Sequence, residues 1–231
     1  MKVKFGAIIV DGRNKIGGHV LSKNRAGAYM RTKVTPVNPQ TVAQMNVRNR
    51  FASLSSAWKA LTAAERLAWN NAVAAYAKTD IFGDLKNPSG FNLHQSLNNN
   101  LLNVGESAIT TPLDSAAVGV YEEMSFTIEN DEESLEITFD PLSDADHKTV
   151  VLATPAISPG RYNVSNRYRQ IAVLDPEAPS LHNALVAYSA VFGAIGSTGM
   201  KVFISMFQVN INTGQAGLPI AASALITLGI T

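Results

Sequence analysis

The sequence predicts an α+β protein of several modules, in which an N-terminal β-hairpin arm and a three-helix module precede a C-terminal antiparallel β-sandwich. Three observations carry this prediction. Apolar residues repeat at helical spacing before about residue 105, short alternating segments follow after about residue 120, and the two parts differ sharply in charge. The 231 residues and the 46% hydrophobic content allow one large domain or two small ones with real cores.

These observations divide the chain into four parts. An extended β arm with a basic loop is predicted over residues 1–37, a three-helix module over 38–105, a linker over 106–119 and a β-sandwich domain over 120–231. The linker is assigned because its Thr-Pro and Ser-Ala-Ala turn material follows neither the helical nor the strand period.

Alternation and turn residues define the arm. Residues 3–9 and 28–34 alternate as half-buried strands do, and residues 19–21 form a shorter extended piece. Residues 22–27 are expected to form a basic, glycine-bearing loop. The Thr-Pro-Val-Asn-Pro run over residues 35–39 ends strand pairing, because proline cannot donate to a hydrogen-bond ladder.

The first helix has two possible N-caps. Asn38 precedes Pro39 at a first helical position, whereas Thr41 has Gln44 three residues further on, as in a capping box. The helix is then expected to bury one stripe of apolar residues spaced three and four apart. This stripe consists of Val47, Phe51, Leu54, Trp58 and Leu61.

Two more helices complete the predicted module. Thr62 and Glu65 form a second capping box, after which Trp69, Val73 and Tyr76 repeat the apolar spacing. Residues 78–90 are expected to be a loop. The third helix is predicted over about residues 91–104, ending at a glycine cap. Its inward residues are Leu93, Leu97, Leu101 and Val104, and its cap is Gly105.

Short strands recur in the C-terminal half, separated by turn material, which favours an Ig- or fibronectin-like antiparallel sandwich. The expected strands cover residues 125–129, 135–139, 149–154, 170–174, 185–194, 201–212 and 224–228. Residues 181–194 are also compatible with a helix, and the Tyr-Ser-Ala-Val-Phe run over residues 188–192 favours the strand.

The formal net charge of +1 conceals a strong asymmetry. Residues 1–80 hold thirteen Lys/Arg and three Asp/Glu, a charge of +10, whereas residues 81–231 hold six and fifteen, a charge of −9. Residues 106–146 carry twelve acidic residues and no basic one. This split predicts either that the front faces a polyanion or that the two parts attract each other, within one subunit or head-to-tail between subunits.

A basic cluster supplies the candidate contact residues. Six cations and one tyrosine fall within an interval that contains no acidic residue, so they suit either phosphates or an acidic surface on a neighbouring subunit. These residues are Lys23, Arg25, Tyr29, Arg31, Lys33, Arg48 and Arg50. The length of the Gly- and Pro-bearing extension favours docking on a neighbour.

Signatures of catalysis are missing from the sequence. It has no cysteine, no dinucleotide-binding or Walker loop, no nucleophile elbow and no paired histidines at metal-ligand spacing. The acidic turn over residues 140–147 is interpreted as solvated rather than as an ion site. We therefore expect no catalytic residue, cofactor or metal, and we also expect no secretory signal and no membrane-spanning segment.

Residues 58–69 resemble the HMG-box pattern, in which tryptophan, leucine and a charged pair stabilise two angled helices. HMG boxes bend DNA from the minor groove. The likeness covers only this short segment, and the third helix lacks the dense lysines of such boxes, with His94 as its only titratable group. Trp58 and Trp69 are therefore interpreted as core residues rather than DNA contacts.

A longer resemblance extends over about residues 23–104. Its segments are Lys23-Asn24-Arg25-Ala26-Gly27-Ala28-Tyr29, Val34-Thr35-Pro36-Val37-Asn38-Pro39-Gln40-Thr41, Phe51 to Trp58, Leu61 to Trp69, and Ser89-Gly90-Phe91-Asn92-Leu93. In these segments the chain resembles proteins of tailed bacteriophages and prophages that are encoded among virion structural genes.

The resemblance implies a virion component, made in the bacterial cytoplasm and then part of the particle. It would be a ring, connector, tail or capsid-associated subunit whose partners are copies of itself and other virion proteins. Two alternatives remain open: a DNA-binding protein associated with genome packaging, and a displayed module that binds surfaces or glycans.

Overall fold

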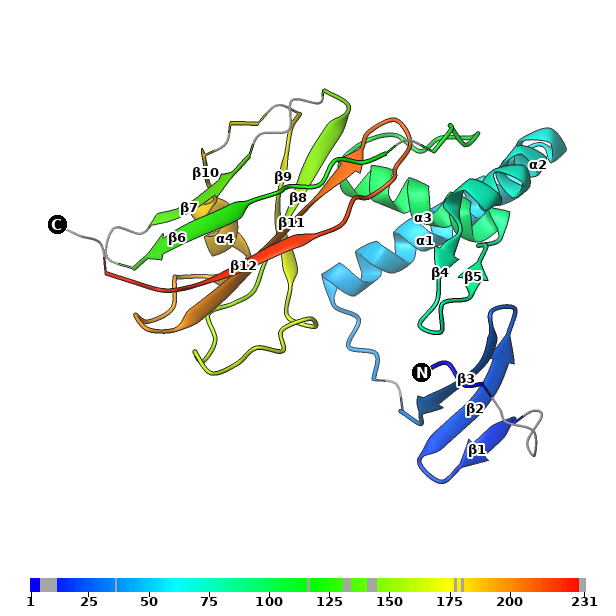
Figure 1. The fold of residues 1–231 in the computed structure, drawn as a ribbon, viewed down its shortest axis with the longest axis horizontal. Coiled ribbons are helices and arrows are strands. Elements are labelled where there is room, and N and C mark those ends of the chain that lie inside the picture. The colour runs from blue at the N-terminus through cyan, green and yellow to red at the C-terminus, as the bar shows by residue number, and fades with distance from the viewer. Residues whose placement is uncertain are drawn as a thin grey trace.

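The computed structural model describes residues 1–4, 12–35, 37–115, 117–130, 134–140, 145–176, 178–179 and 181–228. It is a mixed structure of helices and antiparallel sheets, as the predicted α+β class requires. Figure 1 shows the β-rich C-terminal part beside a group of helices, with the first three strands as a separate small sheet below the helices. No helix among the described residues is long and apolar enough to cross a membrane.

The small sheet has the order β1-β2-β3, with β1 at Asn14–Ile16, β2 at His19–Asn24 and β3 at Gly27–Thr32. The loop predicted over residues 22–27 is shorter than expected, because β2 continues to Asn24 and only two residues form the turn. The Asn24 side chain accepts a hydrogen bond from the Ala26 N–H, and Gly27 supplies a φ of 110°. The strand predicted over residues 3–9 lies mostly outside the described residues.

The small sheet contributes nothing to the described hydrophobic cores. No described residue before Leu54 is buried, and the side chains of the sheet are half-buried at most. A small sheet is independently stable only when three or more strands share a hydrophobic face or when it packs against a helix. We call residues 1–37 the arm from here on.

Helix α1 (Val42–Ala60) starts at Thr41, whose side chain accepts from the Gln44 N–H, so the second of the two predicted caps is confirmed. The capping box of Thr62 and Glu65 is also confirmed, and it starts α2 (Ala63–Ala72). A 3₁₀ turn, η1 (Val73–Tyr76), follows, and α3 covers Gly90–Asn103. Gly105, with a φ of 83°, follows the end of α3 as predicted.

One small core joins the three helices. Leu61, Trp69, Leu93 and Leu97 are buried together, with Trp58 packed against them. The Trp69 Nε1–H donates to the Thr110 carbonyl oxygen at 2.7 Å. The interpretation of both tryptophans as core residues is therefore confirmed. The predicted stripe on α1 is only half right, since Val47 and Phe51 remain 51% and 48% exposed.

The predicted loop over residues 78–90 contains a hairpin. Its strands are β4 (Lys78–Thr79) and β5 (Leu85–Lys86), and they pair antiparallel. Two-residue strands carry too little alternation to be recognised in a sequence.

Two antiparallel sheets make up the C-terminal part, in the orders β10-β7-β6 and β12-β11-β8-β9. The strands are β6 (Met124–Glu129), β7 (Ser134–Phe139), β8 (His147–Ala153), β9 (Arg169–Leu174), β10 (Leu181–Asn183), β11 (Lys201–Asn210) and β12 (Ile220–Leu225). The sheets share one core, to which Ile137, Val151 and Ile204 contribute fully buried side chains.

The strand predicted over residues 185–194 is wrong, because Leu185–Phe192 forms helix α4. This segment is apolar on all sides, so its pattern cannot distinguish a strand from a buried helix. The helix places Tyr188 in the core, where its hydroxyl donates to the Thr154 carbonyl oxygen at 3.2 Å. The short strand β10, just before this helix, has no counterpart among the predicted strands.

The C-terminal end of α3 packs against the C-terminal sheets. Val104 packs with Val150 and Val209, and the Lys148 ammonium contacts the Val104 carbonyl oxygen at 3.3 Å and Glu106 at 2.7 Å. The hydrogen bond from Lys148 to Glu106 raises the pKa of Lys148, in spite of the opposing effect of burial.

The segment predicted as a linker is irregular and packs on the helices. Asn98 exchanges two hydrogen bonds with Ile109, and the Tyr76 hydroxyl donates to the Leu113 carbonyl oxygen. The helices and the C-terminal sheets therefore form one packed body, to which the arm is attached.

Candidate assembly interface

The arm meets the body at the turn between β4 and β5. Asp80 Oδ1 accepts hydrogen bonds from the N–H groups of Phe82 at 2.8 Å and Asp84 at 3.1 Å. Gly83 has a φ of 82°, which closes the turn at a conformation that glycine adopts readily. The turn thus fixes its own backbone through one oxygen of Asp80 and leaves the second oxygen for another partner.

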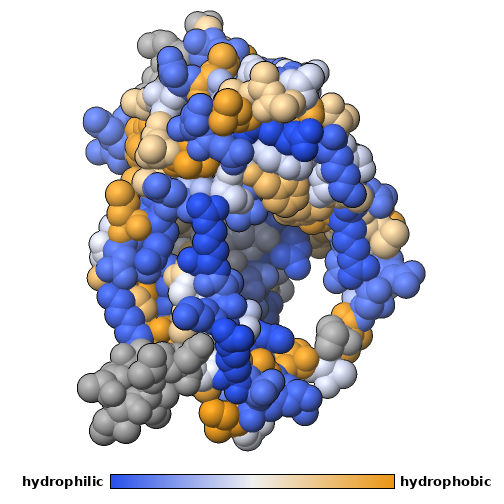
Figure 2. All heavy atoms as spheres, turned by 90° about the vertical axis from the view of Figure 1, so that its right-hand side faces the viewer, coloured by the Kyte–Doolittle hydropathy of each residue, from blue (hydrophilic) through white to orange (hydrophobic). Residues whose placement is uncertain are grey.

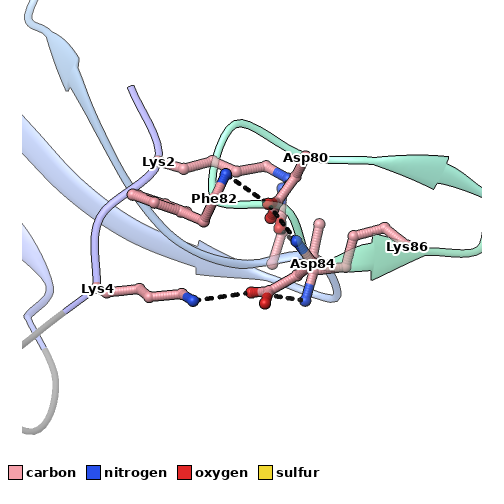
Figure 3. Close-up of polar contacts among 8 residues, drawn as sticks. Lys2, Lys4, Asp80, Phe82, Asp84 and Lys86 are labelled. Carbon is pink, nitrogen blue, oxygen red and sulfur yellow. Dashed lines mark hydrogen bonds and ion pairs between the residues drawn. The ribbon is translucent and has the colours of Figure 1, made fainter.

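Lysines from the beginning of the chain bind this turn. Lys2 Nζ lies 3.0 Å from Asp80 Oδ2, and Lys4 Nζ lies 3.1 Å from Asp84 Oδ2. Lys4 also lies 5.1 Å from the centre of the Phe82 ring, as a cation–π contact. Figure 3 shows both lysines reaching across to the turn, with Lys86 on its other side, 3.9 Å from Asp84. We call Asp80 and Asp84 the socket.

Backbone pairing presents the two lysines to the socket. Residues 1–3 run antiparallel to β3: the Val3 N–H donates to the Ala28 carbonyl oxygen and the Met30 N–H to the Met1 carbonyl oxygen. Lys2 is bridged with Tyr29. This segment therefore acts as an added edge of the arm sheet, and its lysines move with the arm.

The two ion pairs differ in exposure. The Asp80 side chain is only 5% exposed, whereas that of Asp84 is 43% exposed. Burial raises the pKa of the Asp80 carboxyl, but hydrogen bonds from Lys2 and from the Phe82 and Asp84 N–H groups outweigh it and lower this pKa to about 2. Asp80 is thus held ionised, as a firm anchor for a cation, and the Lys4–Asp84 pair adds a weaker, solvated contact.

The predicted basic cluster is spread over separate places. Lys23 and Arg25 lie at the tip of the β2–β3 hairpin, whereas Arg31 pairs with Val20 towards its other end and Lys33 follows β3. Tyr29 is half-buried beside Lys2.

The last two predicted contact residues lie outside the arm, on α1. Arg48 is exposed, but Arg50 donates to the Asn103 side chain on α3 at 3.2 Å. Asn103 in turn donates to Gln170 on β9. Arg50 therefore belongs to the internal joint of the body rather than to a continuous basic patch.

The first half of α1 adds an exposed apolar surface. Val47 and Phe51 lie two turns and one turn before Leu54 on the same stripe, yet only Leu54 is covered. Val42 and Met45, on the same half of the helix, are also exposed. Exposed apolar area that continues a core stripe is typical of a surface that another molecule covers.

A cleft of about 1030 Å³ lies between the tip of the β2–β3 hairpin and the body. It is bounded by residues 24–26 of the arm, by α3 and by residues 215–218. Its lining includes Arg25, Lys78 and Lys86, and no acidic side chain is found among the described residues around it. Figure 2 shows that arm and body also leave an open window between them.

No cluster of metal-ligating side chains lies among the described residues. They contain no group of three or more His, Asp or Glu side chains close enough to hold a metal ion. His147, at the end of the predicted acidic turn, is buried with its Nε2 3.3 Å from the Asn210 amide. Part of that turn, residues 141–144, lies outside the described residues.

The comparisons with known proteins add no family. No protein-family model matches the chain, and no curated protein sequence matches it.

Sequence reasoning missed the socket and its lysines. Lys2 and Asp80 are 78 residues apart, and nothing local joins them. The turn itself carries a signal, since Asp80 and Gly83 are typical turn residues within a segment that is predicted only as a loop.

Proposed function

We propose that this protein is a non-enzymatic structural subunit of a bacteriophage virion, located in a ring, connector, tail or capsid-associated layer. In this proposal the arm docks on copies of the same chain and on other virion proteins. The subunit is made in the bacterial cytoplasm and then incorporated into the particle. The resemblance over residues 23–104 supports the virion assignment.

One observation carries the assembly part of the proposal: the arm has no buried side chain among its described residues, and ion pairs attach it to the body. An element that buries so little within its own subunit gains stability when a neighbour covers it. The exposed apolar residues of α1, such as Phe51, offer additional area for such a neighbour.

The charge distribution supports the same proposal. A basic arm and an acidic C-terminal part attract each other between identical subunits placed head-to-tail, an arrangement that gives a ring when the rotation between subunits closes. We further infer that the two-sheet C-terminal part is an Ig- or fibronectin-like sandwich. In the assembly it supplies the lateral or outward surface.

Mass spectrometry of purified particles, separated into heads and tails, tests the assignment. We expect the chain to be present in one of the two fractions in stoichiometric amounts. Size-exclusion chromatography with light scattering tests assembly, with oligomers expected at low salt and smaller species at high salt, because exposed ion pairs are screened. A strict monomer that is also missing from both particle fractions refutes the proposal.

A further inference from the structure

The attachment of the arm has the properties of an exchangeable contact. Among the described residues, two lysines, one aromatic ring and the two socket carboxylates make its ion pairs and its cation–π contact, and no described residue of the arm belongs to a buried core cluster. Within the described part of the chain, leaving the socket therefore exposes no residue of these core clusters. The same five groups can meet equally well when the lysines and the socket belong to different copies of the chain.

The connection between arm and body permits this exchange. Residues 33–41 join Thr32 at the end of β3 to Val42 at the start of α1, and all the described residues among them are exposed. Of these, Val34, Thr35 and residues 37–40 take part in no hydrogen bond or ion pair. Nine extended residues span up to about 30 Å, which is enough to reach an adjacent subunit.

We propose that in the assembled state the arm of one copy leaves its own body and docks on the next copy, with Lys2 on Asp80 and Lys4 on Asp84 of that neighbour. This inference rests on the proposed function and names its partner and its contact residues. Because the contact joins unlike surfaces, repetition gives a closed ring or an open filament.

The exchange is favoured by a high concentration of the chain and by the additional surface that the neighbouring subunit buries. The socket contacts are the same in the closed monomer and in the exchanged assembly, so they cancel. Assembly then depends on mass action and on the surfaces that the neighbour covers, for which the exposed Val47 and Phe51 of α1 are candidates.

Charge reversal in separate chains tests the exchange. The arm variant carries Lys2→Glu and Lys4→Glu, and the socket variant carries Asp80→Asn and Asp84→Lys. Asparagine keeps the oxygen that accepts from the Phe82 and Asp84 N–H groups, so the turn is preserved. Within either variant, no arm has a socket of opposite charge, whether in its own chain or in a copy of it.

Mixing the two variants distinguishes exchange from closure within one chain. The native socket of the arm variant then meets the native lysines of the socket variant. The Asp84→Lys substitution in turn gives the glutamate introduced at position 4 a cation to pair with. The glutamate introduced at position 2 meets a neutral amide at position 80, whose N–H can donate to it, so neither kind of contact in a mixed oligomer is repulsive. We expect light scattering to show mostly monomers for each variant alone. For the mixture we expect recovery of the wild-type mass, with both differently tagged chains in one peak.

A control separates misfolding from lost contact. A single chain that carries all four substitutions regains the ion pair between positions 4 and 84 and loses all like-charge contacts between arm and socket, so it should recover assembly. Circular dichroism of each variant should match the wild type. As a second measurement, chains with Lys4→Cys and with Asp84→Cys can be linked by a short bismaleimide, since the chain has no native cysteine and each variant offers one thiol.

The outcomes bear differently on the two proposals. A mixture that stays monomeric, with no cross-link between the chains, overturns the exchange and leaves the arm closed on its own body. Variants that assemble alone as well as the wild type also overturn it, while the virion assignment stands on other surfaces. Absence of the wild-type chain from particles, together with a monomeric mass, refutes the proposed function itself.

Discussion

Gly214 joins the turn after β11 to helix α3, and replacing it tests whether helices and sheets form one body. Its φ is 72°, and a Cβ added there would lie 2.3 Å from the Leu97 carbonyl oxygen. The Gly214 carbonyl oxygen also accepts from the Asn100 side chain at 2.9 Å. An alanine at this position must therefore push α3 and the turn apart.

The expected magnitude has two parts. A left-handed backbone costs a residue other than glycine about 1–2 kcal/mol. The added methyl group meets backbone rather than a flexible side chain, which adds the roughly 1–3 kcal/mol typical of overpacking. Gly214→Ala should thus destabilise the protein by about 2–5 kcal/mol, the sum of these two costs. In a chain of this length, each kcal/mol lowers Tm by about 2–4 °C.

Gly105 provides the matched control. Its φ is 83°, but nothing lies within 4 Å of a Cβ built on it, so Gly105→Ala should cost only the backbone part, about 1–2 kcal/mol. Urea unfolding gives both values. Tryptophan fluorescence reports on the helices, which contain both tryptophans, and far-ultraviolet circular dichroism reports on the whole chain. The reasoning is refuted if Gly214→Ala is as stable as Gly105→Ala.

Two further predictions concern the charges. The pKa of Asp80, about 2 in the folded chain against an ordinary 3.8, means that its contribution to stability is present above about pH 4 and is lost as the pH falls through about 2. An NMR titration should show that the pKa of Asp80 is higher in Lys2→Ala than in the wild type. An unchanged pKa would mean that Lys2 does not contact Asp80 in solution. For the alternative of DNA binding, fluorescence anisotropy with duplex and single-stranded DNA at low salt is expected to show no binding. Steeply salt-dependent binding would instead favour contact with phosphates. In that case the slope of log K against log salt concentration should become shallower by about 1 in Arg48→Ala.

Locally encoded features can be predicted from the sequence. The caps at Thr41 and Thr62 and the inward face of α3 depend on residues three or four positions apart, so they can be recognised without knowing the rest of the fold. Most strands of the C-terminal part are predictable for the same reason, because alternation is a property of neighbouring residues. The basic arm also follows from the sequence, as a matter of composition.

Contacts between distant residues are decided only by the tertiary structure. The same apolar stripe on α1 is covered at Leu54 and exposed at Phe51, because α1 extends beyond its helical neighbours. The segment Leu185–Phe192, apolar apart from Ser189 and Tyr188, is a helix in the folded chain, where Tyr188 is buried and donates to the Thr154 carbonyl oxygen. Lys2 and Asp80 meet because the chain folds back over 78 residues, and the sequence pattern of neither residue encodes that return.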